Sequence, residues 1–349
     1  MGLDKLNIIS VGKPPAAPIR KTTSEWTRCD RWGHVKCRLT AFRLKYTVEP
    51  GLYSIGNPDR NADVFASANY KLSFDHLRRG LSGMNAWILV LDTKGINVWC
   101  AAGKGTFGTE ELVKRIKEAG LDNVVEHRRI ILPQLAGPGV NAKAVLKACG
   151  FRVAFGPVSA SDISAYMSAG YEKSAAMRTV KFALMDRLVL TPMEINPAMS
   201  KFPIFAVIVL LIFGLNPSGI IFRDAWHGGM PFVLLGLIAV FSGAFLTPVL
   251  LPFVPFRSFA IKGWLMGVLT VFLSLQLIPG EGILIRTVEY LFFPLLSSYI
   301  ALQFTGSTAF TGMSGVKKEL KIGIPVYIIS AVLSFLLLIV YKLKTWEVL

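Results

Sequence analysis

Apolar segments dominate the second half of this chain, and they limit its fold more than any other feature. After Phe202, five segments each approach the roughly 20 residues that a helix needs to cross the hydrocarbon core of a bilayer. Their approximate bounds are 202–222, 231–251, 259–278, 283–304 and 323–341. Because backbone groups in lipid must be hydrogen-bonded within the protein, such segments are expected to be helical. The sequence therefore predicts an all-α transmembrane domain of five helices over residues 202–349.

Basic residues near the ends of these segments predict how the chain is oriented. Lysine and arginine lie before or at the start of the first, third and fifth segments, at Arg178, Lys181, Arg187, Lys201, Arg257, Lys262, Lys317, Lys318 and Lys321. Cytoplasmic loops usually carry the excess of such cations. We therefore expect a multi-pass protein of the cytoplasmic (inner) membrane, with its N-terminal domain in the cytoplasm and its C-terminus outside. Lys342 and Lys344 oppose this orientation.

Between residues 45 and 170, short apolar runs alternate with helical patterns. Strands are expected at 63–66, 86–91, 123–126 and 151–155, and helices at 74–81, 109–119 and 141–149. This alternation predicts a parallel sheet covered by helices on both faces. Flanking segments are expected to lack regular structure. They are a polar leader over 1–44, which includes the flexible stretch 12–18, and a basic linker over 171–201.

Charge and cysteine content exclude some classes of function. The formal net charge is +16, but no basic face is interleaved with aromatic residues, so we expect membrane lipid rather than nucleic acid as the partner. The four cysteines, at positions 29, 37, 100 and 149, have no C-x-x-C spacing. Cys29, His34 and Cys37 do not make a tetrahedral zinc set without a fourth ligand. Any electron donor is therefore expected to be a separate protein.

One cysteine lies in an unusual segment between the strand expected at 86–91 and the helix expected at 109–119. Its sequence is Asn97-Val98-Trp99-Cys100-Ala101-Ala102-Gly103-Lys104-Gly105-Thr106. The small residues after Cys100 would let a flat ligand approach the backbone, and a thiolate is a soft metal ligand. Asn97 is expected to cap the turn, and Lys104 to favour the thiolate. Cys100 is therefore a candidate axial ligand, although a buried cysteine usually only packs.

Two other functions compete with this interpretation. Gly103, Gly105 and Gly108 match the pattern G-x-G-x-x-G, which favours a membrane-anchored NAD(P)-dependent oxidoreductase. Against it, Gly103 lies a dozen residues after Leu91, where a dinucleotide site needs a tight turn. The apolar half would also suit a transporter or scaffold, but it shows neither paired broken helices nor an internal repeat.

The segment 97–104 resembles the signature of the mercury-methylating corrinoid proteins (HgcA type). Their corrinoid domain is similar to that of the large subunit of the corrinoid iron–sulfur protein. Further matching blocks occur in order at 50–53, 68–71, 91–96, 132–135 and 156–158. Ser67 stands where threonine is expected. The resemblance implies a Rossmann-like corrinoid-binding domain over residues 45–170, with a transmembrane domain after it.

The resemblance also implies a cofactor, an activity and partners. The cofactor is a cobalamin-type corrinoid with cobalt, and the activity is transfer of its methyl group to Hg(II), which forms methylmercury. Cys100 would be the catalytic residue and the lower axial ligand of cobalt. The implied cofactor contacts are Ser67, Asn69, Thr93, Asn97, Val98, Trp99, Cys100, Ala101, Ala102, Gly103, Lys104, Gly105 and Thr106. The implied partners are a methyltetrahydrofolate-type methyl donor and a ferredoxin-like electron donor with two 4Fe–4S clusters.

Overall fold

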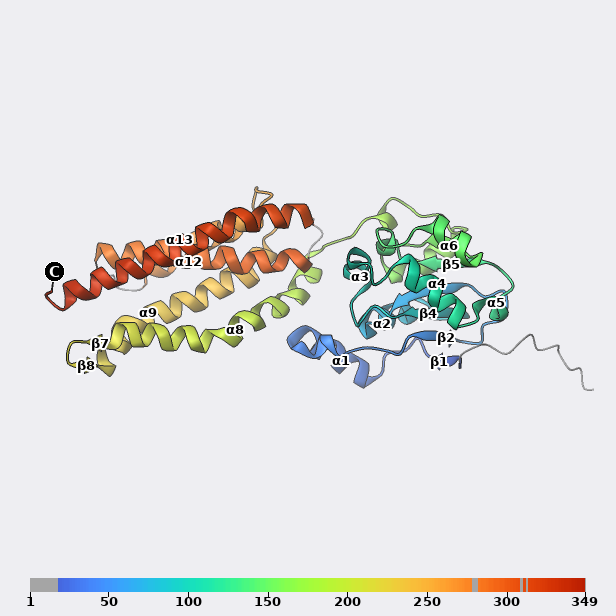
Figure 1. Ribbon diagram of the computed structural model, residues 1–349, viewed down its shortest axis with the longest axis horizontal. Coiled ribbons are helices and arrows are strands. Elements are labelled where there is room, and N and C mark those ends of the chain that lie inside the picture. The colour runs from blue at the N-terminus through green and yellow to red at the C-terminus, as the bar shows by residue number, and fades with distance from the viewer. Residues whose placement is uncertain (1–17, 278–281, 308–309, 312, 349) are drawn as a thin grey trace, which may run out of the picture. The chain divides into compact units, whose positions relative to one another are not determined.

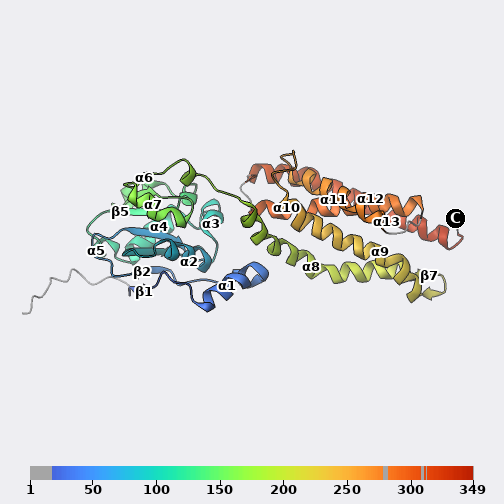
Figure 2. The same ribbon diagram turned by 180° about the vertical axis from the view of Figure 1, so that it is seen from behind.

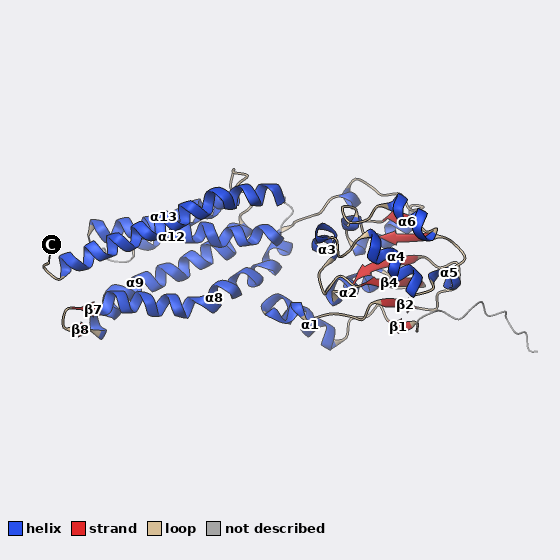
Figure 3. Cartoon of the chain, in the orientation of Figure 1, coloured by secondary structure: helices blue, strands red, loops and turns tan. Residues whose placement is uncertain are grey.

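The structure is a computed structural model that describes residues 18–277, 282–307, 310, 311 and 313–348. Within the predicted leader, residues 1–17 lie outside the described residues. The chain divides into two compact units, 1–181 and 182–349. Strands form a sheet in the first unit, whereas the second is helical apart from a short hairpin, β7 (Leu215–Asn216) and β8 (Gly219–Ile220) (Figure 3).

A six-stranded mixed sheet forms the centre of the first unit. Its strands are β1 (Arg20–Thr22), β2 (Gly51–Ile55), β3 (Val64–Ala68), β4 (Ala86–Leu91), β5 (Arg129–Leu132) and β6 (Arg152–Phe155), in the order β1-β2-β4-β3-β5-β6. Neighbours from β4 to β6 are parallel, as predicted. The prediction of a wholly parallel sheet is wrong at β2, which runs antiparallel to β4. No helix connects β2 to β3, whereas parallel neighbours such as β1 and β2 are joined by a helical crossover, here through α1.

Helices cover both faces of this sheet, as the alternating pattern predicts (Figure 1, Figure 2). Leu89 and Leu91 of β4 pack with the residues of α3 (Val98–Lys104), α4 (Thr109–Glu118), α5 (Leu121–Val124) and α6 (Ala142–Cys149). Ile88 and Val90 point to the other face, toward α2 (Lys71–Gly80) and α7 (Ile163–Ser168). This two-residue period is the reason that β4 is almost wholly buried and could be predicted at its observed bounds.

The chain between α4 and α6 differs from the prediction. The strand expected at 123–126 is instead the end of α5 and a loop, because Gly120 takes the left-handed conformation and Val125 N–H bonds to Leu121 O. Val124 and Val125 are buried, but they lie at the end of α5 and in the loop after it rather than in a strand. Strand β5 lies at residues 129–132, where no strand was predicted.

The N-terminal region also differs from the prediction of a loop over residues 1–44. It contains β1, helix α1 (Arg28–Leu39) and the 3-10 helix η1 (Ala41–Leu44). Thr27 caps α1 by accepting the Asp30 N–H at 3.1 Å, and Asp30 in return accepts the Thr27 N–H at 2.9 Å. The buried positions of α1 are Asp30, Gly33, His34 and Cys37, so hydrophobic periodicity does not reveal this helix.

The second unit is built from long apolar helices. They are α8 (Leu184–Gly214), α9 (Phe222–Phe241) with the π-helical η5 (Ser242–Leu246) and α10 (Thr247–Val249), α11 (Phe259–Leu275), α12 (Ile283–Gln303) and α13 (Met313–Thr345). Four stretches within the described residues are long and apolar enough to cross a membrane, and α11 is a shorter apolar helix of 17 residues. Helix α8 begins inside the segment expected to be a linker. The remaining 3-10 helices are η2 (Gln134–Ala136), η3 (Ala160–Asp162), η4 (Ala176–Arg178) and η6 (Phe304–Ser307).

Candidate functional site

A cavity of about 290 Å³ lies at the carboxyl ends of β3, β5 and β6. The chain leaves β3 through α2 toward β4 and then returns through α3 and α4 to β5, on the other side of β3. The direction in which successive strands are added to the sheet therefore reverses between β3 and β5. In α/β sheets, ligands bind at such a switch point, outside the carboxyl ends of the strands. The cavity is thus where the fold itself predicts a site.

Residues far apart in the sequence meet around this cavity. Four of the predicted site residues, Ser67, Asn97, Val98 and Trp99, line it. Most of the blocks at 132–135 and 156–158 line it as well. Gly156 is held close to its neighbours, because a Cβ there would lie 3.0 Å from Cγ2 of Ile131. Apart from a few polar groups, the wall is apolar, which is typical of small-molecule sites.

Cys100 follows these lining residues directly. The segment 98–104 forms helix α3, and Asn97 caps it by accepting the Cys100 N–H at 2.9 Å, which confirms the predicted cap. Cys100 is half-buried, and its neighbour Trp99 remains 38% exposed. The cap therefore fixes the backbone of the cysteine beside the cavity, while its side chain remains accessible.

Ala101 and Ala102 do not face outward. They are 0% and 4% exposed and belong to the hydrophobic core. Gly139 lies against the backbone of Ala102, because a Cβ at Gly139 would lie 3.0 Å from Cα of Ala102. In this structure the two alanines therefore belong to the core, and their contact with a flat ligand stays a prediction. Their small size instead lets α3 pack closely on the loop after η2.

The glycines that follow form helix ends. Gly103 lies within α3, Gly105 ends α3 with a φ of +81°, and Gly108 precedes α4. A Cβ at Gly108 would lie 2.6 Å from Gly105 O. A dinucleotide fingerprint needs its first glycine in the turn directly after a strand. Here a helix intervenes, which counts against the oxidoreductase alternative.

Two further predicted contact residues shape the loop that leads to α3. Asn69 Oδ1 accepts the Thr93 N–H at 3.1 Å and the Gly95 N–H at 3.0 Å, and Thr93 Oγ1 lies 2.7 Å from Ile96 O. Both side chains are buried, and neither lines the cavity. Lys104 is exposed at the end of α3, and Thr106 is half-buried with Oγ1 3.5 Å from Ala101 O. Asn69 and Thr93 therefore hold the loop in place, while Lys104 faces outward.

Helix α2 contributes two polar residues that sequence reasoning missed. Ser73 and His76, three residues apart on one helix face, line the cavity. Desolvation of the imidazole by the surrounding protein lowers the pKa of His76, and the nearby His34 and Arg38 lower it further. His76 is therefore neutral at pH 7 and presents a hydrogen-bonding group without a charge. Its three-residue spacing from Ser73 was the only signal in the sequence.

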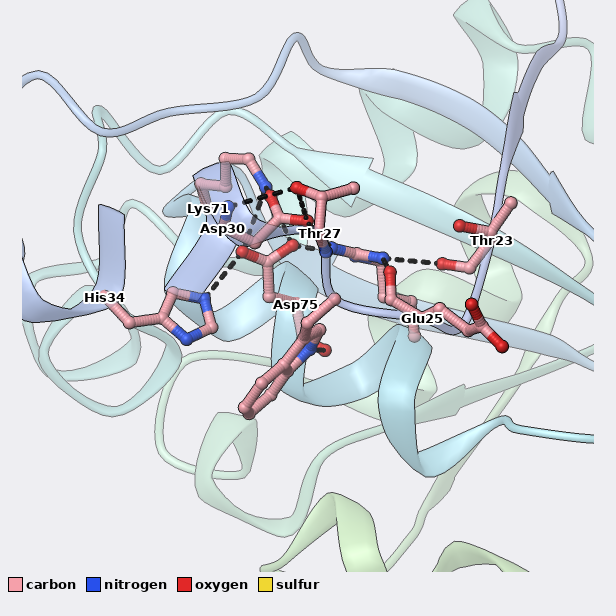
Figure 4. Close-up of polar contacts among 9 residues, drawn as sticks. Thr23, Glu25, Thr27, Asp30, His34, Lys71 and Asp75 are labelled. Atoms are coloured by element: carbon pink, nitrogen blue, oxygen red, sulfur yellow. Dashed lines mark hydrogen bonds and ion pairs between the residues drawn. The ribbon is translucent and has the colours of Figure 1, made fainter. Parts of the chain in front are cut away.

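A buried ion cluster fixes α2 to α1 (Figure 4). Asp75 Oδ2 is 2.8 Å from His34 Nε2, and Asp75 Oδ1 accepts from Lys71 Nζ at 2.8 Å and from Arg78 Nε at 2.7 Å. Asp30 accepts from the same Lys71 and Arg78, at 2.5 and 2.7 Å. We call these five residues the ion cluster. The sequence signal for it was the charged spacing of Lys71, Asp75 and Arg78 on one helix.

The cluster holds both carboxylates in their charged form. Burial alone would raise the pKa of Asp75, but hydrogen bonds from His34, Lys71 and Arg78 hold it below its ordinary value. Burial likewise opposes ionisation of Asp30, and hydrogen bonds from Lys71 and Thr27 outweigh it and lower its pKa. The cluster is therefore a set of paired charges, which α1 needs in order to remain on α2.

An α/β domain with an apolar cavity at its switch point, followed by long apolar helices, defines a ligand-binding domain joined to a helical region of membrane-protein composition. Comparisons with known proteins identify the domain further. Residues 33–167 match the family described as CO dehydrogenase/acetyl-CoA synthase delta subunit. This match covers α2, α3, the whole cavity and every residue of the ion cluster except Asp30. The chain thus carries a domain similar to the corrinoid proteins of that family.

Individual relatives agree with this match. The acetyl-CoA decarbonylase/synthase complex subunit gamma of Methanocaldococcus jannaschii is 41% identical over 103 residues, 29% of this chain and 21% of the relative. The same subunit of Methanopyrus kandleri is 30% identical over 163 residues, 46% and 34% of the two chains. The corrinoid/iron-sulfur protein large subunit of Moorella thermoacetica is 32% identical over 129 residues, 35% and 27%. The chain thus spans about a fifth to a third of the length of these relatives.

Proposed function

We propose that this chain is a corrinoid-dependent methyltransferase that transfers a methyl group to Hg(II) and forms methylmercury. The observation that carries the proposal is the position of Cys100, half-buried on a capped helix whose first residues line the switch-point cavity. Similarity to a corrinoid/iron-sulfur protein supports the cofactor. The segment around Cys100, which resembles the mercury-methylating proteins, supports the acceptor.

The residues around the cavity fit a corrinoid. A volume of about 290 Å³ is near the lower limit of small-molecule sites, so the cavity suits one substituent of so large a cofactor rather than the whole. The outer side of α3 is open, because a Cβ at Gly103 would meet nothing within 4 Å. An accessible thiol, an open helix side and an adjacent apolar cavity are together what a flat metal cofactor requires.

Each residue then has a role. A bound corrinoid would supply a cobalt ion that can carry a methyl group and release it with its electrons. The Cys100 thiolate would hold that cobalt and, as a soft sulfur donor, would increase the electron density available to a Hg(II) substrate. Asn97 holds the backbone of Cys100, and Asn69 holds the loop before it. Ser67, Val98 and Trp99 contact the cofactor from the cavity wall.

Partners and location follow from the same proposal. Several relatives are named as subunits of a complex, which supports a protein partner. We assign that role to a ferredoxin-like electron donor with two 4Fe–4S clusters, and the methyl supply to a methyltetrahydrofolate-type donor. The Rossmann-like domain would lie in the cytoplasm. The four long helices and the shorter α11 would be five spans of the cytoplasmic membrane, with the C-terminus outside.

Reconstitution of the purified full chain with hydroxocobalamin tests this function. We expect about one cobalt per chain, with a visible spectrum that changes in Cys100→Ala and is preserved in Cys149→Ala, whose Sγ is hydrogen-bonded to Val145 O at 3.2 Å. Reduced chain supplied with a methyl donor and Hg(II) should then yield methylmercury, measured by mass spectrometry. Binding of NAD(H) without binding of cobalamin would instead support the oxidoreductase. Bound cobalamin with no methylmercury would remove Hg(II) as the acceptor.

A further inference from the structure

Helix α1 carries large apolar side chains on its outer face. Trp32, Val35 and Leu39 are 67%, 41% and 46% exposed, and their spacing of three and four residues places them on one side of the helix. The opposite side buries Asp30 and His34. A surface helix ordinarily has its apolar residues inside and its polar residues outside. The arrangement in α1 is the reverse.

The apolar surface continues into the next element. In η1, Phe42 and Leu44 are 37% and 72% exposed. Both views show α1 outside the helical layers that cover the sheet (Figure 1, Figure 2). We call Trp32, Val35, Leu39, Phe42 and Leu44 the outer apolar residues. Apolar side chains gathered in this way on a protein surface mark an interaction site.

Cations flank the outer apolar residues. Six lie between positions 28 and 45, at Arg28, Arg31, Lys36, Arg38, Arg43 and Lys45. The one acid in this stretch is Asp30, and it is buried in the ion cluster. The charge that α1 and η1 present to their surroundings is therefore entirely positive. Apolar residues with an indole, flanked by Lys and Arg, are typical of helices that lie in a membrane interface.

We propose that α1 and η1 lie on the surface of an anionic lipid bilayer, with the outer apolar residues inserted between the headgroups and the flanking cations against lipid phosphates. Charge complementarity favours lipid over a protein partner, because six cations without an exposed acid match a uniformly anionic surface. The same chain also contains a segment that would anchor it to a membrane. Helix α8, long and apolar enough to cross a membrane, begins at Leu184, shortly after the first unit ends at residue 181.

This surface is connected to the cavity through the ion cluster. Lys71 and Arg78 of α2 donate to Asp30 of α1, and Asp75 of α2 is hydrogen-bonded to His34 of α1. The same helix α2 presents Ser73 and His76 to the cavity. The bilayer would therefore fix the position of α2 as well as that of α1. The proposal does not depend on methyl transfer, so it stands or fails separately from the proposed function.

Photocrosslinking of the full chain in nanodiscs tests the proposal. Benzoylphenylalanine replaces Val35 in one sample and Lys114, an exposed residue of α4, in the control. Discs contain phosphatidylcholine alone or with phosphatidylglycerol, and adducts are identified by mass spectrometry. We expect lipid adducts at position 35 that increase with phosphatidylglycerol, and only background at position 114. A position-35 adduct on polypeptide instead of lipid would show that this surface binds protein and would overturn the proposal.

A charge variant separates lipid binding from mere proximity to the disc. Arg31→Gln and Lys36→Gln leave the buried face of α1 unchanged. In anionic discs they should lower the lipid adduct yield by up to about fivefold for each cation removed. Protection of the buried Cys37 from a thiol reagent verifies that α1 is still folded. An unchanged yield in the folded double variant, or equal yields in both disc types, would rule out recognition of anionic lipid.

Discussion

Helices α1 and α3 lie in the same unit and bury opposite kinds of side chain. Helix α3 places Ala101 and Ala102 in the hydrophobic core and leaves Cys100 and Trp99 accessible. Helix α1 buries Asp30 in an ion cluster and exposes apolar residues. Close packing therefore holds α3, whereas paired charges hold α1. The two helices should respond differently to loss of volume, loss of charge and change of pH.

The largest difference should concern two cysteines, one on each helix. Under the proposed function, Cys100→Ala should lower methylmercury formation by at least about 1,000-fold, since loss of a central catalytic residue typically has an effect of that size or more. Cys29→Ala, which removes an exposed thiol from α1, should leave the rate unchanged. Initial rates with reconstituted cofactor measure both. Equal losses in the two variants would mean that Cys100 has no special role.

Removal of a charge should loosen α1 and leave α3 in place. Asp75→Ala removes one of the two carboxylates that Lys71 and Arg78 share and the partner of His34 on α1, and loss of one partner of a buried ion pair costs about 3 kcal/mol or more. Cys37, 1% exposed on α1, should then react faster with dithiodipyridine. Glu118→Ala, at an exposed ion pair of α4, should change stability by less than about 1 kcal/mol. A Cys37 rate that Asp75→Ala leaves unchanged would show that charges do not hold α1.

This contrast explains what the sequence could predict. Strand β4, α4 and α6 have apolar residues at the spacing of a buried strand or helix, so their positions were predicted closely. Helix α1 was missed because its buried positions are polar, and only the spacing of Thr27 and Asp30 indicated a helix start. Strand β5 was missed because its apolar residues lead directly into Pro133, a residue typical of turns and loops.

The candidate site shows the same division. Four contiguous site residues, Asn97 to Cys100, and Ser67 were predicted from the cysteine segment and from the end of β3. His76 was missed, because its position beside the cavity depends on how α2 packs. The inward direction of Ala101 and Ala102 was also missed, since small residues suit a ligand and a close backbone contact equally well. A sequence motif therefore indicated the candidate site, but only the structure shows which side of α3 is open.

A fall in pH should detach α1 from α2 before it affects α3. The pKa values of Asp30 and Asp75 are lowered in the folded protein, so their stabilisation is present above their unfolded values, near about 4, and is lost as pH falls below them. The reactivity of Cys37 toward dithiodipyridine, which also reacts in acid, should rise below that pH. In Asp75→Asn the acid-dependent rise should be smaller. A rise of the same size in this variant would assign the effect to other groups.

Added volume should have the converse effect, on α3 rather than on α1. Ala102→Leu forces new atoms into the hydrophobic core that surrounds this 4% exposed residue, and overpacking of this kind costs about 1–3 kcal/mol. Gly103→Ala is the matched control on the adjacent residue. A Cβ there meets nothing within 4 Å, so the substitution should be neutral or should stabilise the helix by up to about 1 kcal/mol. Thermal unfolding of the full chain in detergent measures the stability of both variants. The reactivity of Cys37 on α1 should be unchanged in both. If Ala102→Leu left stability intact and prevented only cobalamin binding, Ala102 would contact the ligand after all, and α3 would have to turn its buried face outward when the cofactor binds.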